Sequence, residues 1–279
     1  MISASTSMRD ALDGAVTALS AAGCETPRLD AELLLAHALG VGRERLLTCN
    51  LTVAGPAVRV FQDYVRRRSV GREPVAYILA RRHFRRLELA VDRRALIPRP
   101  ETELLVEVGL ALPQGASVLD VGTGSGAVAL ALADERADLS VTGSDSSAAA
   151  LDLARANGER FGLDVRWAHA DLLDGVPDEF DAVLSNPPYV REDDRASLAP
   201  EILRYEPPSA LFAGEDGLAV VRRLTAEAGE RARVRLLAVE VGQGQAGIVG
   251  KLMREAGFAS VRAERDLAGI ERVVVGERR

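Results

Sequence analysis

The tetrapeptide Asn186-Pro187-Pro188-Tyr189 directly follows an apolar, strand-like run at residues 181–185. The side chain of Asn186 and the backbone of Pro187 each offer a carbonyl oxygen, and two such acceptors suit the two hydrogens of an NH2 group. The prolines restrict φ and hold these acceptors in place, while Tyr189 offers a flat face to a planar group. This arrangement suits methyl transfer to an amide or amine nitrogen, whose delocalised lone pair makes it a poor nucleophile. Asn-Pro also opens ordinary turns, so a plain turn is the alternative.

A second loop that could do chemistry is rich in glycine. It reads Gly122-Thr123-Gly124-Ser125-Gly126 and joins an apolar, strand-like segment to an Ala/Leu-rich, helix-like one. The spacing matches neither the dinucleotide-binding fingerprint nor a P-loop. Glycines let the backbone pass close to a ligand, and the N-terminus of the following helix favours a carboxylate. The alternative is a tight strand–helix turn that binds nothing.

Acidic residues follow the next predicted strands. Asp145 lies nineteen residues after Gly126, at the end of the segment 139–144, and Asp171 follows the strand-like residues 165–169. An acidic residue at the end of a second strand is well placed to accept both ribose hydroxyls of a nucleoside. The glycine loop, Asp145, Asp171 and Asn186 each come just after a predicted strand. Because parallel strands end at one edge of a sheet, we expect these four loops to converge on one crevice.

The pattern of apolar residues predicts how the chain is organised. Residues 1–73 have helical spacing and predict a small helical bundle, and residues 74–97 alternate like a β-hairpin linker. Strands and helices alternate through residues 98–279, which predicts an α/β domain with a doubly wound, mostly parallel sheet. Residues 260–265 and 272–275 resemble a closing antiparallel pair at the C-terminal end.

The sequence resembles the release factor glutamine methyltransferases, also called the PrmC or HemK type. The resemblance extends over nearly the whole chain, and Ile97-Pro98-Arg99-Pro100-Glu101-Thr102-Glu103 is its most specific segment. Asn-Pro-Pro-Tyr alone is shared with adenine methyltransferases. The other segments that carry the resemblance are residues 73–79, 122–126, 185–189, 205–207, 210–211, 240–245 and 266–272.

This resemblance implies a fold, a reaction and a partner. The fold is a Rossmann-like class I methyltransferase sheet, preceded by a helical domain that recognises the substrate protein. The reaction transfers a methyl group from S-adenosylmethionine to the side-chain nitrogen of the glutamine in the Gly-Gly-Gln motif of class 1 peptide chain release factors. S-adenosylhomocysteine is the product, and translation termination is the process affected.

The family's site residues carry over to numbered positions here. The resemblance implies that the glycine loop wraps the methionine end of the cofactor, that Asp145 holds the ribose and that Asp171 and Leu172 approach the adenine. It assigns the catalytic role to Asn186, Pro187 and Tyr189, the binding of the target glutamine to Asn186, Pro187, Pro188, Tyr189 and Phe84, and an additional cofactor contact to Asn186. Relatives often carry an aromatic residue where this chain has Leu172. Relatives also differ at Arg85 and Arg86, which follow Phe84.

Composition narrows the class of protein. The chain has 279 residues, of which 47% are hydrophobic and 27% charged, as in an ordinary soluble globular protein. We see no apolar run long enough for a membrane span and no signal peptide, and we expect a cytoplasmic monomer. Cys24 and Cys49 lack metal-ligand spacing, and the three histidines are scattered, so we expect idle thiols and no metal.

Charge is distributed unevenly along the chain. The net charge of −6 argues against general nucleic-acid binding and against DNA as a partner. Residues 59–99 nevertheless contain twelve arginines and four acidic residues. This segment is either an ordinary solvated surface or a docking surface for an acidic protein or RNA.

Two other functions are compatible with parts of the pattern. A nucleobase methyltransferase would use the same four-residue loop, but it would need to extract a base from a stack and would carry a dedicated basic region. A silent binding module would keep the fold without turnover. The presence of all the expected polar groups favours an active enzyme.

Overall fold

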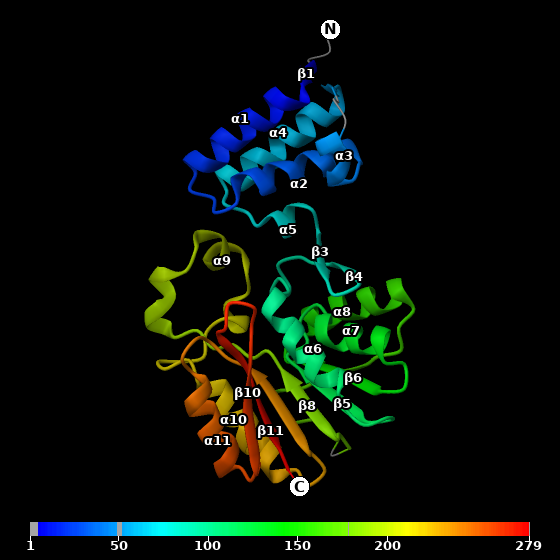
Figure 1. The fold of residues 1–279 in the computed structure, drawn as a ribbon, viewed down its shortest axis with the longest axis vertical. Helices are drawn as coiled ribbons and strands as arrows, with labels where there is room; N and C mark the ends of the chain where they lie inside the picture. Colours follow the sequence, from blue (N-terminus) through cyan, green and yellow to red (C-terminus); the bar gives the residue numbers. More distant parts are fainter. Residues whose placement is uncertain (1–4, 49–51, 178, 279) are drawn as a thin grey trace. The chain divides into compact units, whose positions relative to one another are not determined.

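The computed structural model of the protein describes residues 5–48, 52–177 and 179–278. The chain forms two compact units (Figure 1). Unit 1 contains the residues up to Ala80 together with Ala199–Tyr205, and unit 2 contains Arg81–Leu198 and Glu206–Arg279. The chain therefore passes between the units three times. None of the described helices is long and apolar enough to cross a membrane.

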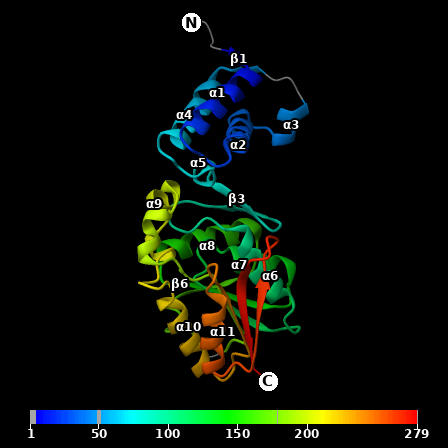
Figure 2. The ribbon, with the colours of Figure 1, turned by 60° about the vertical axis from the view of Figure 1, so that its left-hand side comes forward.

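Unit 1 is a helical bundle with a small strand pair. Its helices are α1 (Met8–Ala21), α2 (Pro27–Leu39), α3 (Arg43–Thr48), α4 (Pro56–Ser69), α5 (Val75–Ile78) and α9 (Pro200–Tyr205). Helices α1, α2 and α4 pack against one another (Figure 2), around fully buried leucines such as Leu19, Leu34 and Leu35. The strands β1 (Ser5–Ser7) and β2 (Thr52–Ala54) pair antiparallel, which the sequence pattern did not predict. Three-residue strands are too short to show a recognisable alternation.

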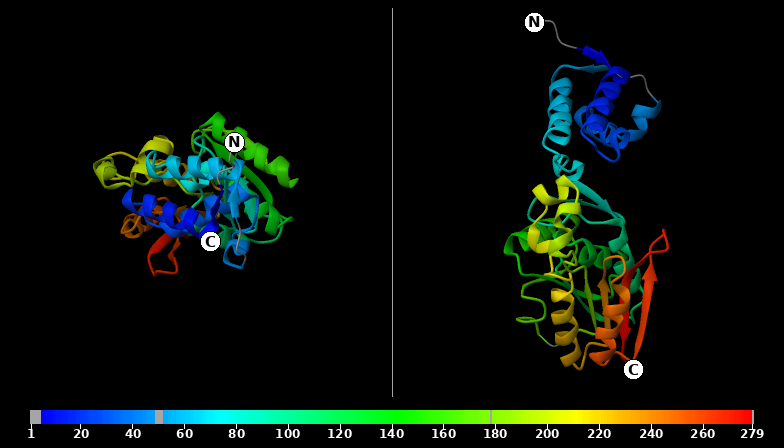
Figure 3. Two further views of the ribbon diagram at one scale, coloured as in Figure 1. Left: turned by 90° about the horizontal axis from the view of Figure 1, so that it is seen from above. Right: turned by 90° about the vertical axis from the view of Figure 1, so that its left-hand side faces the viewer.

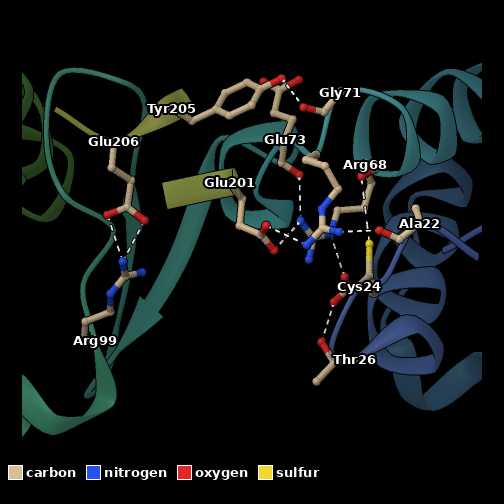
Figure 4. Close-up of polar contacts among 12 residues, drawn as sticks. Ala22, Cys24, Thr26, Arg68, Gly71, Glu73, Arg99, Glu201, Tyr205 and Glu206 are labelled. Carbon is tan, nitrogen blue, oxygen red and sulfur yellow. Dashed lines mark hydrogen bonds and ion pairs between the residues drawn. The ribbon is translucent and has the colours of Figure 1, made fainter. Parts of the chain in front are cut away.

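A buried ionic cluster joins α9 to the rest of unit 1. Arg68 is 6% exposed, and its Nε lies 2.7 Å from Asp30 Oδ2 while its Nη1 lies 3.2 Å from Glu201 Oε1 (Figure 4). Arg72 Nη2 also lies 2.7 Å from Glu201, and the hydroxyl of Tyr205 donates to the Gly71 carbonyl at 3.0 Å. Buried charges need such partners, because a lone charge in this environment is costly. These contacts make α9 part of unit 1 although it follows the Asn-Pro-Pro-Tyr loop in sequence.

Cys24 lies beside this cluster and is a free, buried thiol. Its Sγ lies 4.0 Å from the carbonyl oxygen of Arg68, and burial raises the pKa of the thiol. Cys49 lies outside the described residues.

Unit 2 begins with the predicted hairpin, formed by β3 (Arg81–Phe84) and β4 (Leu87–Ala90). Asn157 fixes this hairpin to the rest of unit 2. Its Oδ1 accepts from the Ala90 N–H at 2.8 Å, and its Nδ2 donates to the carbonyls of Ala90 and Ser125 at 3.0 and 2.9 Å. The amide is fully buried and uses both of its ends, so it links the hairpin to the loop that precedes α7 (Ala127–Glu135).

The centre of unit 2 is a seven-stranded sheet in the order β10-β11-β9-β8-β5-β6-β7. Strands β5, β6, β7, β8 and β9 are parallel, and β11 runs antiparallel between β9 and β10. The antiparallel pair forms one edge of the sheet (Figure 3). The prediction of a mostly parallel sheet with a C-terminal antiparallel pair is confirmed. The strands are β5 (Ser117–Val121), β6 (Ser140–Asp145), β7 (Arg166–His169), β8 (Ala182–Ser185), β9 (Leu236–Glu240), β10 (Ser260–Arg265) and β11 (Glu271–Glu277).

Helices cover both faces of this sheet (Figure 1). One face packs α6 (Glu103–Leu110), α7 (Ala127–Glu135) and α8 (Ala148–Phe161), and the other packs α10 (Ala219–Glu230) and α11 (Ala246–Glu255). Because helices cover both faces, β5 and β8 are buried along their whole length. Three short 3₁₀ helices complete the unit: η1 (Pro100–Thr102), η2 (Glu192–Ser197) and η3 (Pro208–Ala210).

Folding neutralises most of the arginine-rich segment. Ion pairs with acidic side chains of the described residues are formed by at least eight of its twelve arginines: Arg66, Arg67, Arg68, Arg72, Arg81, Arg85, Arg94 and Arg99. Several of these acids come from outside the segment, such as Glu206, whose two oxygens lie 2.7 and 2.9 Å from Arg99 Nη2 (Figure 4). The segment's excess of positive charge is therefore largely structural, which favours the first of its two interpretations.

Candidate active site

A cavity of about 240 Å³ lies at the carboxyl ends of the parallel strands of unit 2. Its wall includes residues from the loops that follow β5, β6, β7 and β8, which are the four loops expected to converge. Ten of the predicted site residues line it: Gly122, Thr123, Gly124, Ser125, Asp145, Asp171, Leu172, Asn186, Pro187 and Pro188. Residues far apart in the sequence thus meet at one edge of the sheet, as the topology of a doubly wound fold requires.

Three predicted site residues lie outside the lining of this cavity. Gly126 is the N-cap of helix α7, and a Cβ at this position would approach Leu130 and Trp167 to 3.0 and 3.1 Å. Its proposed contact with a cofactor remains a prediction. Phe84 is 1% exposed in the hairpin, and Tyr189 is held by its hydroxyl on Glu240. The proposed contacts of Phe84 and Tyr189 with a substrate remain predictions.

The glycine loop is shaped by main-chain hydrogen bonds. The N–H groups of Gly122 and Thr123 both donate to the carbonyl of Ser144, at 2.8 and 2.9 Å, and Gly124 N–H donates to Asp145 Oδ2 at 3.0 Å. Gly122 and Gly124 have φ values of +72° and +57°, which lie in the left-handed region that side chains other than glycine enter at a cost. Alternate glycines are therefore needed for the loop to turn over the end of β6.

A buried carboxylate supports this loop from below. Asp120 is 2% exposed, and it accepts from the Thr123 hydroxyl at 2.6 Å and from the Ala129 N–H at 3.2 Å. The Ala129 N–H belongs to the first turn of α7, where N–H groups lack partners within the helix. Burial raises the pKa of Asp120 to about 6, while these two hydrogen bonds oppose the shift.

Two polar side chains in the cavity wall have the character expected for a nucleoside-containing cofactor. The carboxylate of Asp145 is oriented by the N–H groups of Gly124 and Ser147, at 3.0 and 2.9 Å, and each of its oxygens keeps a further lone pair for a hydroxyl. Ser125 is 2% exposed, and its Oγ makes no hydrogen bond with the described part of the chain. A buried hydroxyl without a partner is unusual, so Ser125 fits a wall that receives a polar ligand.

The wall beyond β7 has a different character. Asp171 forms an ion pair with Arg223, with 3.0 Å between Oδ2 and Nη2, and both side chains are more than half exposed. Leu172 follows with a φ of +56°, inside a turn closed by the Asp174 N–H on the Asp171 carbonyl at 3.0 Å. A residue other than glycine in this region carries strain of about 1–3 kcal/mol, which the surrounding structure must offset.

Asn186 is the first member of a series of side-chain hydrogen bonds that involves three segments. Its Nδ2 donates to Thr102 Oγ1 at 3.1 Å, and the Thr102 hydroxyl donates to Glu240 Oε2 at 2.7 Å. The hydroxyl of Tyr189 donates to the other oxygen, Glu240 Oε1, at 3.4 Å. Asn186 and Thr102 line the cavity, whereas Glu240 lies behind them at the end of β9 and is 2% exposed.

Burial changes the acidity of two of these groups. It raises the pKa of Glu240 to about 7, assisted by the nearby Glu101 and opposed by the Thr102 and Tyr189 hydroxyls and by Arg272. Burial also raises the pKa of Tyr189 well above its ordinary value, and the charge of Glu240 adds to this effect. Tyr189 therefore keeps its proton, whereas Glu240 changes its charge near neutral pH.

Sequence reasoning gave no role to Asp120, Thr102 or Glu240. Thr102 and Glu240 nevertheless lie within the segments 97–103 and 240–245, and Asp120 lies in the strand before the glycine loop. The signal was present for Glu240, because it ends β9, the strand next to β8, and strand ends had already located Asp145 and Asn186. Thr102 could not be found in this way, since it comes from a 3₁₀ turn that folding places beside the sheet. The described residues contain no group of three or more His, Cys, Asp or Glu side chains that could hold a metal ion.

Comparison with known proteins shows the family. Residues 10–79 match the model of the PrmC N-terminal domain, and residues 100–225 match that of the methyltransferase small domain. The release factor glutamine methyltransferase of Xylella fastidiosa is 42% identical over 268 residues, which cover 94% of this chain and 97% of the relative. That of Rhodospirillum rubrum is 40% identical over 273 residues, covering 96% and 84%. This chain belongs to the release factor glutamine methyltransferases. The family resemblance noted in the sequence is confirmed.

The fold is also found in a solved structure of low sequence identity to this chain. A methyltransferase from Pyrococcus furiosus is 19% identical and superposes with a TM-score of 0.53, over 68% of this chain and 88% of the other. As a release factor glutamine methyltransferase by family, the chain is an enzyme with a methyltransferase fold. The cavity at the strand ends is the natural place for its chemistry.

Proposed function

We propose that this chain transfers a methyl group from S-adenosylmethionine to the side-chain amide nitrogen of a glutamine in class 1 peptide chain release factors. The target is the glutamine of the Gly-Gly-Gln motif, and the modification tunes translation termination in the cytoplasm. The observation that carries the proposal is the position of Asn186 and Pro187 in the same cavity wall as the glycine loop and Asp145. Acceptors for an NH2 group and a cradle for a nucleoside therefore share one cavity.

The cofactor would occupy the part of the cavity built from the glycine loop. When bound, S-adenosylmethionine supplies a methyl group already attached to a good leaving group. The main chain of residues 122–125 would follow its methionine end, and Asp145 would accept hydrogen bonds from the ribose hydroxyls. Leu172 and Asp171 would face the adenine, with Leu172 giving an aliphatic contact. The unpartnered hydroxyl of Ser125 supports a polar ligand here.

The target amide would be bound by the Asn-Pro-Pro-Tyr loop. Asn186 Oδ1 and the Pro187 carbonyl would accept the two N–H hydrogens, which orients the amide nitrogen and stabilises the positive charge that grows on it. Holding both reactants in a near-attack geometry is worth several kcal/mol, on the order of intramolecular effective molarities. A strong base is not required before transfer, because the methylated amide is acidic and loses its proton afterwards. Tyr189 and Phe84 would exclude water.

The N-terminal helical part has a proposed role of its own. We assign residues 1–73 to recognition of the release factor, residues 74–97 to a hairpin linker and residues 98–279 to the catalytic domain. The match of residues 10–79 to a domain named for this family supports a dedicated role. A monomeric enzyme and a protein partner, rather than DNA, complete the proposal.

The test is a methylation assay with defined partners. The purified chain is incubated with labelled S-adenosylmethionine and a purified class 1 release factor, and the modified peptide is mapped by mass spectrometry. We expect one added methyl group on the glutamine of the Gly-Gly-Gln motif, and none in a release factor whose glutamine is replaced by glutamate. Label in adenine-containing nucleic acid with none in the release factor would overturn the proposal in favour of a nucleobase methyltransferase.

A further inference from the structure

We propose that Glu240 and Thr102 act as positioning residues that fix which end of the Asn186 amide faces the substrate. The inference rests on the proposed function, since it concerns how the methyl acceptor is bound. It starts from the hydrogen bonds from Asn186 to Thr102 and from Thr102 to Glu240, at 3.1 and 2.7 Å. Neither Glu240 nor Thr102 needs to touch the substrate for this role.

The direction of these hydrogen bonds follows from the chemistry of the groups. An ionised carboxylate is an acceptor only, so the Thr102 hydroxyl must donate its single hydrogen to Glu240. The lone pairs of Thr102 then accept, and the part of Asn186 that can donate is Nδ2. The carbonyl Oδ1 is thereby left for another partner. The ionised carboxylate thus selects the amide orientation that presents an acceptor to the NH2 group of a glutamine.

Protonation of Glu240 at Oε2 reverses this order. The carboxylic acid can donate to Thr102, whose own hydrogen then turns toward Asn186 and favours the flipped amide. In that orientation Asn186 offers an NH2 group to a substrate that also presents NH2, and the binding contact is lost. Because burial brings the pKa of Glu240 to about 7, the reversal falls within the physiological range.

The other charged and titratable groups around Glu240 come from η1, from β11 and from the loop after β8. Glu101 from η1 favours the protonated form, while Arg272 from β11 favours the ionised form. Arg272 is itself paired with Asp266, at 2.8 Å between Nε and Oδ2. Tyr189 keeps its proton, since burial raises its pKa, and it donates to the opposite oxygen of Glu240. Burial brings the pKa of Glu240 to about 7, so its charge changes near neutral pH.

The first test compares two substitutions at Thr102 in the full-length enzyme with its release factor. Thr102→Val keeps the shape but removes the hydroxyl, and we expect kcat to fall about tenfold to a hundredfold, while calorimetry shows an unchanged Kd for the cofactor. Thr102→Ser keeps the hydroxyl and should restore kcat to within about threefold. The matched control is Thr142→Val, because Thr142 is buried and its Oγ1 has no hydrogen-bond partner in the described part of the chain. Equal kcat in Thr102→Val and Thr142→Val would overturn the proposal.

The second test observes Asn186 directly and does not depend on turnover. The chain has three asparagines, Asn50, Asn157 and Asn186, so ¹⁵N-asparagine labelling gives three side-chain NH2 signals. Asn186→Ser identifies the signal of interest by its loss. We expect this signal to shift with a midpoint near pH 7 in the wild type and to stay constant in Glu240→Gln, which cannot titrate. The wild-type kcat should fall as the pH drops below about 7, and this acid limb of the pH profile should be missing in Glu240→Gln.

The two tests separate this inference from the proposed function. We call the hydrogen-bonded series Asn186–Thr102–Glu240 the relay. If the wild type fails to methylate the release factor but the Asn186 signal titrates as described, the relay stands and the substrate assignment is wrong. If the release factor is methylated but the Asn186 signal is constant from pH 6 to 8.5 in the wild type, the relay is wrong. A Glu240→Gln variant that keeps the wild-type acid limb would also refute it.

Discussion

The candidate active-site cavity has two halves, and in each of them a buried carboxylate accepts a hydrogen bond from a threonine hydroxyl. The donor half is the part that we propose binds the methyl donor, and it comprises the glycine loop, Asp145, Asp171 and Leu172. Within it, Asp120 accepts from the Thr123 hydroxyl at 2.6 Å. The acceptor half is the part that we propose binds the target amide, and it comprises residues 186–188 and Thr102. Within it, Glu240 accepts from the Thr102 hydroxyl at 2.7 Å. In the donor half, main-chain N–H groups also donate to Asp120, to Asp145 and to the Ser144 carbonyl. The hydrogen bonds of the Glu240 carboxylate come instead from side-chain hydroxyls.

This difference determines how each half responds to protons. A main-chain N–H has a fixed direction, so the glycine loop keeps its shape whichever form Asp120 takes. Hydroxyl hydrogens rotate, and an amide can exchange its two ends, so the acceptor half has two arrangements of nearly the same shape. We infer that cofactor binding depends little on pH near neutrality, while presentation of the Asn186 acceptor depends on it.

The largest expected effect comes from removing the acceptor in the acceptor half. Asn186→Ala should lower kcat by at least about a hundredfold to a thousandfold, because it deletes the polar group that we propose interacts with charge developing in the transition state. The donor half remains intact, so the cofactor Kd measured by calorimetry should change little. An equal loss of cofactor binding would contradict the separation of the two halves.

The second expected effect concerns stability. The folded-state pKa of Glu240, about 7, lies above its ordinary value of 4.5, so the folded protein binds a proton more readily than the unfolded chain in this interval. The group's contribution to stability is therefore fully present below pH 4.5 and is lost as the pH rises through 7. At pH 8 the loss is on the order of 3 kcal/mol, from 1.36 kcal/mol per pKa unit.

Urea unfolding of the wild type and Glu240→Gln at pH 5 and pH 8 measures most of this loss. The variant should gain stability relative to the wild type between the two pH values. Asp120→Asn should show the same trend at a lower midpoint, because burial raises the pKa of Asp120 to about 6. Both halves would then share the stability cost of a buried carboxylate, while the Asn186 signal would titrate in Asp120→Asn and not in Glu240→Gln. A constant difference between the wild type and Glu240→Gln would show that the buried charge is compensated.

The sequence predicted the donor half better than the acceptor half for a physical reason. Strand periodicity and glycine spacing are local signals, and they placed the glycine loop, Asp145 and Asn186 at strand ends correctly. The relay depends on two contacts between residues that are far apart in sequence. Asn186 and Thr102 are separated by 84 positions, and Thr102 and Glu240 by 138 positions. The same limit applies to α9, which belongs to unit 1 through the contact between Arg68 and Glu201, although it follows the Asn-Pro-Pro-Tyr loop in sequence.

The third prediction tests the donor half. Asp145→Ala removes the carboxylate proposed to accept the ribose hydroxyls, so the cofactor Kd should rise about tenfold to a hundredfold, as expected for hydrogen bonds to a charged group. At saturating cofactor, kcat should stay within about threefold of the wild type. Asp152→Ala is the matched control, since Asp152 is an exposed carboxylate on α8 that pairs with Arg155. A fall in kcat at unchanged Kd would assign Asp145 to catalysis instead of binding.

The smallest expected effect refines the donor half at Leu172, where relatives often carry an aromatic residue. Leu172→Phe keeps the same left-handed backbone requirement, because both residues are strained equally at a φ of +56°. If Leu172 faces the adenine, the phenyl ring adds stacking worth about 0.5–1 kcal/mol, and the cofactor Kd should fall about twofold to fivefold. Leu172→Ala should raise the Kd by shrinking the contact. If both variants left the Kd unchanged, the adenine would lie elsewhere in the cavity, and its binding would depend on Asp171 and Arg223.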